Sequence, residues 1–470
     1  MCKAITEMTI PPSVESFGDY IFAYSGLTSL VKGMDWIPSN FYRGCAGFTD
    51  LIIPDSIRDV HKYAFCECPN LTSVTIRGGV FGESAFRNCD ALKEVTIEQC
   101  ENIGSHAFYN CGALKEVTIE QCSDIGSSAF LHCEILPEIT LPEGLVSIGS
   151  SAFQNCYSLK HLTIPSTVES VGSNILMDCY RVRYVDWLST HADVPQLNSY
   201  SSYSNPNMLL FMPAGVSSHS GNKNLVCDGM AFRLELCQDL FYTPRSFTAQ
   251  KVVFTINYGS DRWKNTSTGT GVAARWNTIA VPFDVSSITS NTKGALAPFG
   301  SDAVNEGKAK PFWLCELTAE GFKDATSIEA NKPYIIAMPN NPNYVDEYNI
   351  QDLVSFVGYN VTIPLSSEKQ PSSPTGPAGW ALTPIYQESS DASLMAINWS
   401  SFTDKYNVWH PVGNCFRQNA RTAYAFEAVI STPAAISVAK QKGYISLGGA
   451  TTRSTRPLGR IPQREDMPMP

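Results

Sequence analysis

One pattern of apolar and polar residues recurs through the first 190 residues. Residues 91–112 and 113–134 match at 16 of 22 positions, and each contains Leu-x-x-Val-x-Ile, then Ile-Gly-Ser, then Ala-Phe-x-x-Cys. The first of these segments alternates apolar and polar positions, and its β-branched residues favour a strand with one buried face. Self-similarity at a fixed period is typical of stacked repeats, which together bury a face that one repeat cannot bury alone. The pattern predicts a solenoid of about eight rungs.

Cysteine, phenylalanine and glycine occupy fixed positions in this repeat. Seven cysteines recur at spacings of 23, 21, 22, 22, 23 and 23 residues and define a cysteine ladder: Cys45, Cys68, Cys89, Cys111, Cys133, Cys156 and Cys179. Four phenylalanines are expected to stack inside the solenoid: Phe86, Phe108, Phe130 and Phe153. The glycine of Ile-Gly-Ser is expected to supply positive φ in a turn, for example at Gly104, Gly126 and Gly149.

The cysteine ladder could indicate disulfides, metal ligands or simple packing. Metal sites need convergent ligands such as paired Cys-x-x-Cys, whereas here each rung supplies one cysteine, and only Cys66 beside Cys68 approaches a chelating pair. A free cysteine behaves as a small buried hydrophobe, so we predict packing, with no metal and no cofactor. Stacked rungs lie about 5 Å apart, within disulfide reach, which leaves adventitious oxidation open. Cys100 and Cys122 form a second, shorter column.

The polar positions of the predicted strands form a candidate binding surface. Its residues lie on successive rungs: Glu94, Thr96, Glu116, Thr118, Glu138, Thr140, His161 and Tyr184. The simpler interpretation is a solvated face whose like charges are relieved by Lys93, Lys115 and Lys160. The functional interpretation is a strip that binds a cationic partner or a divalent ion and ends at His161 and Tyr184.

Charge separates this repeat region from the rest of the chain. The 470 residues carry a net charge of −10, and all of it lies in residues 1–190, which hold 12 Lys+Arg against 22 Asp+Glu and 11 of the 15 cysteines. An acidic chain argues against nucleic acid as a partner. The 43% hydrophobic content excludes global disorder, and no apolar run reaches the roughly 18–20 residues that span a membrane. We therefore treat residues 1–190 as a separate domain.

The second part of the chain has a different pattern. Residues 191–245 lose the period and are interpreted as a cap and junction. Residues 246–445 contain short alternating runs separated by Gly, Pro and Asn, which predict an antiparallel β-sandwich. Residues 446–470 are rich in Pro and Arg and are predicted to be disordered.

Motifs for catalysis are absent from the sequence. The seven histidines include no His-Glu-x-x-His, and there is neither Gly-x-Ser-x-Gly nor a P-loop, so we predict no enzyme. A pair of glycosidase carboxylates that meet only in space stays open. Six tryptophans of the β module could stack on sugars, although a sandwich core is their commoner place: Trp263, Trp276, Trp313, Trp380, Trp399 and Trp409.

The phrases IGSSAFQNCYSLKHLTIPSTVESVG and ESAFRNCDALKEVTI resemble the BspA-like, Treponema pallidum-type leucine-rich repeats that are abundant in surface proteins of Bacteroides and related bacteria. The resemblance covers about residues 5–187. It implies a leucine-rich repeat solenoid with a parallel sheet, followed here by an all-β antiparallel sandwich-like domain. It also implies a cell-surface or secreted location and a role in adhesion. The chain begins inside a repeat without a cap or export signal, so we expect a truncated start or a mature fragment.

Together these observations predict a non-enzymatic surface protein that binds a protein, matrix or host-surface ligand over the solenoid. The first alternative is a protein that binds or processes glycans through its C-terminal β module. The second is that this module serves only as a stalk.

Overall fold

The structure is a computed structural model of the chain. It describes residues 8–11, 14, 17–198, 205–260, 276–340, 344–376, 379–391, 393–398, 402–403, 409–410, 415–418, 421–430 and 444–446. The fold divides into two compact units, Met1–Asp228 and Gly229–Pro470. The segment predicted to be disordered, residues 446–470, lies outside the described residues except for Ser446.

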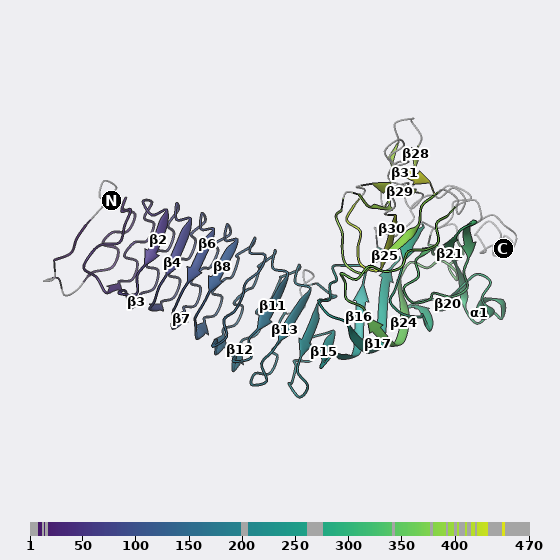
Figure 1. The fold of residues 1–470 in the computed structure, drawn as a ribbon, viewed down its shortest axis with the longest axis horizontal. Coiled ribbons are helices and arrows are strands. Elements are labelled where there is room, and N and C mark those ends of the chain that lie inside the picture. The colour runs from purple at the N-terminus through teal and green to yellow at the C-terminus, as the bar shows by residue number, and fades with distance from the viewer. Residues whose placement is uncertain are drawn as a thin grey trace. The chain divides into compact units, whose positions relative to one another are not determined.

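The first unit is a solenoid of parallel strands (Figure 1). The Leu-x-x-Val-x-Ile segments form its longer strands, and four of them make one sheet: β2 (Asp50–Ile53), β4 (Ser73–Ile76), β6 (Glu94–Ile97) and β8 (Glu116–Ile119). Parallel pairing resumes after one rung with β11 (His161–Ile164), β13 (Tyr184–Trp187), β14 (Leu209–Met212) and β15 (Leu225–Cys227). The predicted solenoid with a parallel sheet on one face is confirmed.

Short strands form another parallel sheet of the solenoid, one strand per rung. These are β1 (Trp36–Ile37), β3 (Asp59–Val60), β5 (Val80–Phe81), β7 (Asn102–Ile103), β9 (Asp124–Ile125), β10 (Ser147–Ile148) and β12 (Ser170–Val171). Unlike the sheet of longer strands, this one continues without a break from β1 to β12.

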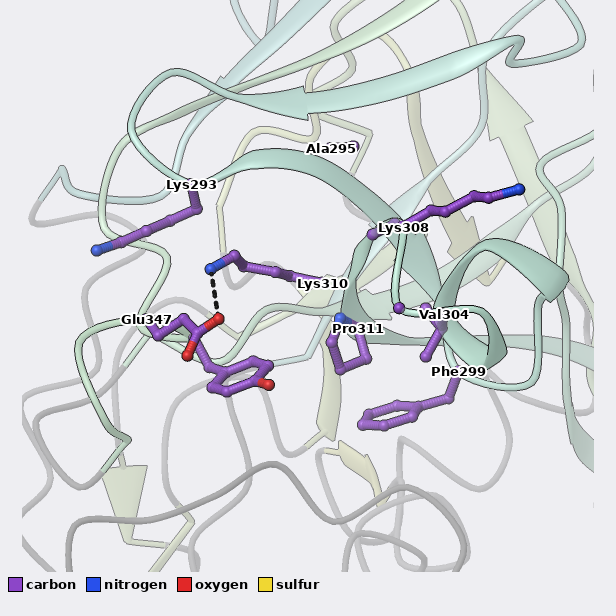
Figure 2. Close-up of a pocket in the computed structure, with 11 residues that line it drawn as sticks. Lys293, Ala295, Phe299, Val304, Lys308, Lys310, Pro311 and Glu347 are labelled. Carbon is purple, nitrogen blue, oxygen red and sulfur yellow. Dashed lines mark hydrogen bonds and ion pairs between the residues drawn. The ribbon is translucent and has the colours of Figure 1, made fainter. Parts of the chain in front are cut away.

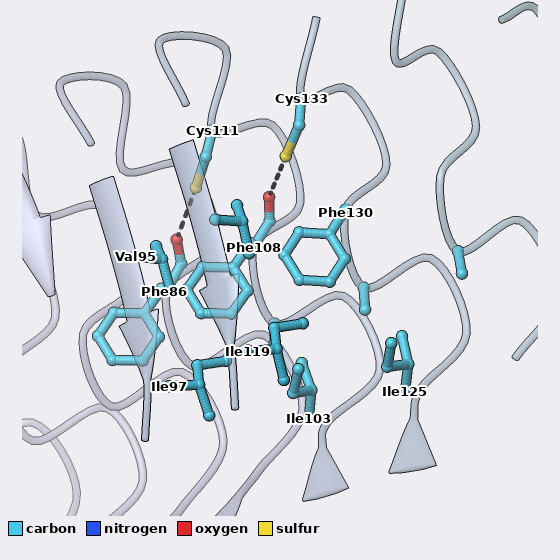
Figure 3. Packing of buried hydrophobic residues seen from close by; sticks show 14 of the residues in the cluster. Phe86, Val95, Ile97, Ile103, Phe108, Cys111, Ile119, Ile125, Phe130 and Cys133 are labelled. Carbon is cyan, nitrogen blue, oxygen red and sulfur yellow. Dashed lines mark hydrogen bonds between the residues drawn. The ribbon is translucent and has the colours of Figure 1, made fainter. Parts of the chain in front are cut away.

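The core between these sheets is organised around the phenylalanine column. Phe86, Phe108, Phe130 and Phe153 are at most 1% exposed. The ring centroids of neighbouring phenylalanines lie 5.3, 5.3 and 5.7 Å apart, with the ring planes within 11° of parallel. Figure 3 shows the first three of these rings, Phe86, Phe108 and Phe130. The separation follows the rung spacing, which is close to the distance between paired strands. The predicted aromatic stack is therefore confirmed.

Each ladder cysteine is tied to the rung before it. All seven are at most 3% exposed. Each Sγ–H donates to the carbonyl of the aromatic residue one rung earlier, at 2.9 to 3.4 Å, as Cys111 does to Phe86 and Cys133 to Phe108 (Figure 3). A buried carbonyl without a partner is costly, so the weak thiol donor has a structural purpose here. The Phe-x-x-Cys spacing thus links successive rungs.

The expected role of the repeat glycines was wrong. None of Gly104, Gly126 and Gly149 has positive φ. A Cβ at Gly126 would lie 2.5 Å from the backbone nitrogen of Ser105 on the preceding rung, and Gly104 and Gly149 are equally crowded by backbone. Positive φ occurs later in the turn, at residues such as Ser128 (φ 56°) and His132 (φ 64°). Glycine is required because two backbones approach closely there, and not because of its dihedral freedom.

One rung interrupts the sheet of longer strands. Residues 136–141 follow the repeat pattern but form no strand, so β8 and β11 are not joined through them. Pro137 lies within this segment, and Pro142 directly follows it. Proline has no N–H, so each removes a donor that the sheet would otherwise use. The break separates the sheet of longer strands into two parts.

The second unit is a two-sheet β structure. One sheet has the strand order β16-β17-β24-β19-β20-β21-β23-β18, with β22 on β21, and the other β25-β30-β26-β29-β31. The first contains β16 (Met230–Cys237), β17 (Phe247–Asn257), β18 (Asn277–Ile279), β19 (Ser287–Ser290), β20 (Gly294–Pro298), β21 (Lys310–Thr318), β22 (Gly321–Asp324), β23 (Tyr334–Ala337) and β24 (Leu353–Ile363). The second contains β25 (Leu382–Ile385), β26 (Met395–Ile397), β29 (Cys415–Gln418), β30 (Glu427–Ile430) and β31 (Tyr444–Ser446). Outside both lie α1 (Asp302–Asn305), β27 (Phe402–Thr403) and β28 (Trp409–His410).

These two sheets share a core, as a sandwich does. Leu317 and Ile335 of one sheet belong to the same buried cluster as Leu382 and Phe416 of the other. Most strand pairs are antiparallel, which confirms the sandwich-like prediction. The pairs β16–β17 and β20–β21 are parallel, so the first sheet is mixed.

Candidate functional site

The outward residues of β6 and β8 lie side by side as the repeat predicts. Glu94 is paired in register with Glu116, and Thr96 with Thr118. Both glutamates are exposed, while the alternate residues Val and Ile face the core. Like charges on neighbouring strands repel one another. An unpartnered acidic column would therefore be unfavourable on this sheet.

A lysine relieves part of that repulsion. Lys115 Nζ lies 3.3 Å from a carboxylate oxygen of Glu94, and both side chains are 52% exposed. An ion pair this exposed contributes little to stability, about 0–1 kcal/mol. It does reduce the negative potential of the strip, as the solvated-face interpretation requires. The binding role of the strip stays a prediction.

The strip is not continuous on a sheet. Glu138 and Thr140 are exposed, as expected, but they lie on the rung that forms no strand. Glu94 and Glu116 therefore lie on paired strands, whereas Glu138 lies on irregular backbone. A ligand that needs three evenly held carboxylates would meet this interruption between Glu116 and Glu138.

Beyond the break, aromatic rings replace the acidic residues. His161 and Tyr184 are paired in register on β11 and β13, and their rings stack at 5.2 Å with planes 10° apart. Both are half-buried. The structure thus brings these two predicted residues together as a flat pair on the outer face of the sheet.

A second stacked pair was missed in the sequence. Tyr157 and Tyr180 lie on the same two rungs, with ring centroids 5.5 Å apart. Tyr180 is 41% exposed. Burial, and then the nearby charges of Glu134 and Asp178, raise the pKa of Tyr157 above its usual value. Each tyrosine directly follows a ladder cysteine, and that shared repeat position was the signal available.

The second unit contains an open pocket of about 440 Å³. Lys293, Lys308 and Lys310 contribute to its lining, together with Phe299 and Tyr348. Lys310 Nζ lies 3.2 Å from Glu347 Oε1 (Figure 2) and 5.5 Å from the centroid of the Tyr348 ring. The pocket thus combines aromatic walls with a charged pair. Nothing in the sequence singled out these residues.

The tryptophans considered for sugar stacking have other positions. Trp276 and Trp380 are 3% and 7% exposed and belong to the sandwich core. Trp313 is half-buried and packs against the same core. Trp263, Trp399 and the side chain of Trp409 lie outside the described residues.

The residues that the structure describes contain no cluster of three or more His, Cys, Asp or Glu side chains arranged to hold a metal ion. In that same part of the chain, no helix has the length and apolar character needed to cross a bilayer. All the described cysteines are free thiols.

Comparison with known families settles the type of repeat. Residues 1–82 and 79–183 match the model of the BspA type leucine rich repeat region, with six copies. The repeat region of this chain is of the BspA type. The matched residues all lie in the first unit.

Several solved structures resemble the BspA-type region. The leucine-rich repeat protein of Treponema pallidum is 23% identical, with 38% of this chain and 68% of that chain covered and a TM-score of 0.24. A leucine-rich repeat protein from Bacteroides ovatus is 21% identical, with 44% of this chain and 65% of that chain covered and a TM-score of 0.27. A leucine rich cell surface protein of Faecalibacterium prausnitzii is 23% identical, with 40% of this chain and 59% of that chain covered and a TM-score of 0.27. The curated proteins searched include no match.

Proposed function

We propose that this chain is a non-enzymatic binding protein of the bacterial cell surface, and that its BspA-type region holds a protein or matrix ligand. The observation that carries the proposal is the regular outer face of the parallel sheet. There, Glu94 and Glu116 stand in register and exposed, and His161 and Tyr184 form a flat aromatic pair. Stacked repeats provide such extended, rigid surfaces for recognition.

The chemistry of this face indicates how it would bind. The acidic residues suit a partner with lysine or arginine side chains, since complementary charge speeds association and fixes register. Aromatic rings contribute most of the affinity in many interfaces because they bury large areas. The acidic part would thus steer a basic partner, and the aromatic part would anchor it.

A matched pair of triple variants tests this role. The full chain is assayed by surface plasmon resonance against collagen, laminin and fibronectin as matrix probes. The strip variant carries Glu94→Lys, Glu116→Lys and Glu138→Lys. The control carries Glu101→Lys, Glu143→Lys and Glu169→Lys, at exposed positions outside the longer strands, with the same change in net charge. We expect the strip variant alone to lose binding.

Two other results would count against the strip. If both triple variants lose binding equally, the interaction depends on net charge and has no defined surface. If neither loses binding, the acidic strip is not the ligand site. Tyr184→Ala, tested with the same probes, measures the contribution of the aromatic pair separately.

The pocket of the second unit favours glycan binding as a second candidate function. Aromatic rings such as Tyr348 can pack on the apolar face of a sugar, while Lys310 and Glu347 can bond its hydroxyls. The full chain on a glycan array, compared with Tyr348→Ala, tests this. Signals that survive the substitution would remove the pocket from consideration, whereas an array without any signal from the unsubstituted chain would favour the stalk.

Surface location is proposed from the BspA-type repeats. Treating intact cells with a protease that cannot cross the membrane should cleave the protein, while a cytoplasmic marker stays whole. A fully protected chain in cells that express it would contradict this location.

A further inference from the structure

Two cysteines outside the ladder face each other. Cys100 and Cys122 lie on consecutive rungs, just after β6 and β8, and their Sγ atoms are 3.2 Å apart. The backbone is held in place there, since Cys100 N–H donates to the carbonyl of Gln121 at 3.0 Å. Each ladder thiol instead donates to a backbone carbonyl of the preceding rung. Cys122 Sγ does lie 3.3 Å from a carbonyl, that of Asp124, but two residues along its own rung. This pair therefore has an arrangement, and a chemistry, of its own.

We propose that Cys100 and Cys122 are a redox-active pair that closes to a disulfide between two consecutive rungs, while the ladder cysteines stay thiols. This inference is independent of the proposed binding function. The oxidant is itself a disulfide, carried either by a small molecule or by an oxidoreductase. No large movement is needed, because neighbouring rungs have the backbone separation that disulfides require.

The reaction is a pair of thiol–disulfide exchanges. Cys122, as a thiolate, attacks one sulfur of the oxidant R–S–S–R and expels one R–S⁻, which leaves a mixed disulfide on Cys122. Cys100 then loses its proton and attacks the Cys122 sulfur, expelling the second R–S⁻. The two protein thiols lose two electrons and two protons in total. The oxidant takes up both electrons and leaves as two thiols.

Access distinguishes this pair from the ladder. Cys100 and Cys122 are each 5% exposed, whereas six of the seven ladder cysteines are 0% exposed and Cys179 is 3% exposed. A disulfide oxidant has to reach sulfur in line with its own bond. The pair lies at the edge of the core, where a slight opening is enough.

Acidity supports the same assignment of roles. The hydrogen bond from Cys100 lowers the pKa of the Cys122 thiol and outweighs burial, which raises it. The pKa of Cys100 is raised, first by its bond to Cys122 and then by burial. In the ladder, burial raises the pKa of the Cys156 thiol to about 12. The thiolate is the reactive form, so Cys122 attacks first.

The test uses the full-length chain without substitutions. The protein is incubated with oxidised glutathione, quenched by alkylation and digested, and the peptides are mapped by mass spectrometry. We expect one cross-linked peptide pair joining Cys100 to Cys122, and ladder peptides that are alkylated after unfolding. A disulfide or glutathione adduct on ladder cysteines, or Cys100 and Cys122 both still free, would overturn the proposal.

Single substitutions test the order of attack. In Cys100→Ser, Cys122 should keep glutathione as a mixed disulfide, because the second thiol is missing. In Cys122→Ser, Cys100 should carry less adduct than Cys122 does in Cys100→Ser, because burial still raises the pKa of Cys100. Equal adducts on both variants would contradict the assigned roles. The matched ladder variant Cys111→Ser should leave the Cys100–Cys122 link unchanged.

Discussion

Replacing a repeat glycine by alanine gives the sharpest test of how the rungs are packed. At Gly126, a Cβ would lie 2.5 Å from the Ser105 nitrogen and 2.7 Å from the Gly104 carbonyl carbon. Both are backbone atoms of the preceding rung, so no side chain can rotate away. At Gly112, nothing lies within 4 Å of an added Cβ, and φ is not positive. The two substitutions are chemically identical and differ only in space.

The expected magnitudes follow from this difference. Overpacking in a close-packed interior costs about 1–3 kcal/mol. We expect Gly126→Ala to fall at the upper end, about 3 kcal/mol, because the two rungs have to separate by several tenths of an ångström. Gly112→Ala should be neutral, or stabilising by about 0.4 kcal/mol through the lower entropy of the unfolded chain.

Urea denaturation of the full chain, followed by circular dichroism, measures both changes, and hydrogen exchange localises them. For Gly126→Ala, the faster-exchanging amides should lie on the rungs of Gly104 and Gly126. If Gly126→Ala unfolds within about 0.5 kcal/mol of Gly112→Ala, the reasoning fails. Glycine would then be present at this position for some other reason.

Three further predictions concern other contacts. Phe108→Ala removes a 1%-exposed ring that is stacked on both sides, and it should lower the free energy of unfolding by about 3–5 kcal/mol in the same denaturation assay. A decrease below about 1 kcal/mol would show that the stacked ring contributes little. Arg421→Gln breaks a 2.8 Å ion pair with Glu427, whose side chain is 2% exposed, and should destabilise the second unit by about 3–5 kcal/mol. Hydrogen exchange in that unit measures the change, and an unchanged exchange rate would show that water reaches the carboxylate. The Arg43 guanidinium holds the pKa of Glu67 below its usual 4.5, so their contribution is present above that pH and is lost as the pH falls through the lowered value. The melting temperatures of the unsubstituted chain and Arg43→Gln should therefore differ at pH 7 and converge in acid; a gap independent of pH would exclude this linkage.

The period of the repeat was sufficient to predict most of the first unit. Residues such as Phe108 and Cys111 recur because each rung has the same inward positions. Residues one repeat apart in the sequence therefore contact each other in the structure. The dihedral angles of the turn were harder to predict. Serine and histidine adopt the left-handed region at Ser128 and His132, where composition alone points to the glycine instead. The break at Pro137 and Pro142 could have been predicted, because both prolines are visible where the sheet needs donors.

The second unit was predictable only at the level of its class. Alternating runs indicate strands, but they do not say which strands pair. β17 pairs with β24 across about a hundred residues of sequence, and β16 pairs with β17 in parallel. The pocket at Lys310 also joins distant parts of the chain, since Lys310 lies on β21 and Glu347 in the loop before β24. Short-range patterns carry no information about such neighbours.

The rung without a strand has a mechanical consequence. On the side of the longer strands, residues 136–141 leave a seam, while the short strands β9, β10 and β12 stay bonded across the same level. Resistance to bending therefore depends on direction. Bending that opens the side of the longer strands stretches few hydrogen bonds at the seam. Bending in the opposite direction has to break hydrogen bonds of the continuous sheet of short strands. Within the described part of the repeat region we therefore expect bending to begin at this seam, and a long ligand attached on both sides of it would load it first.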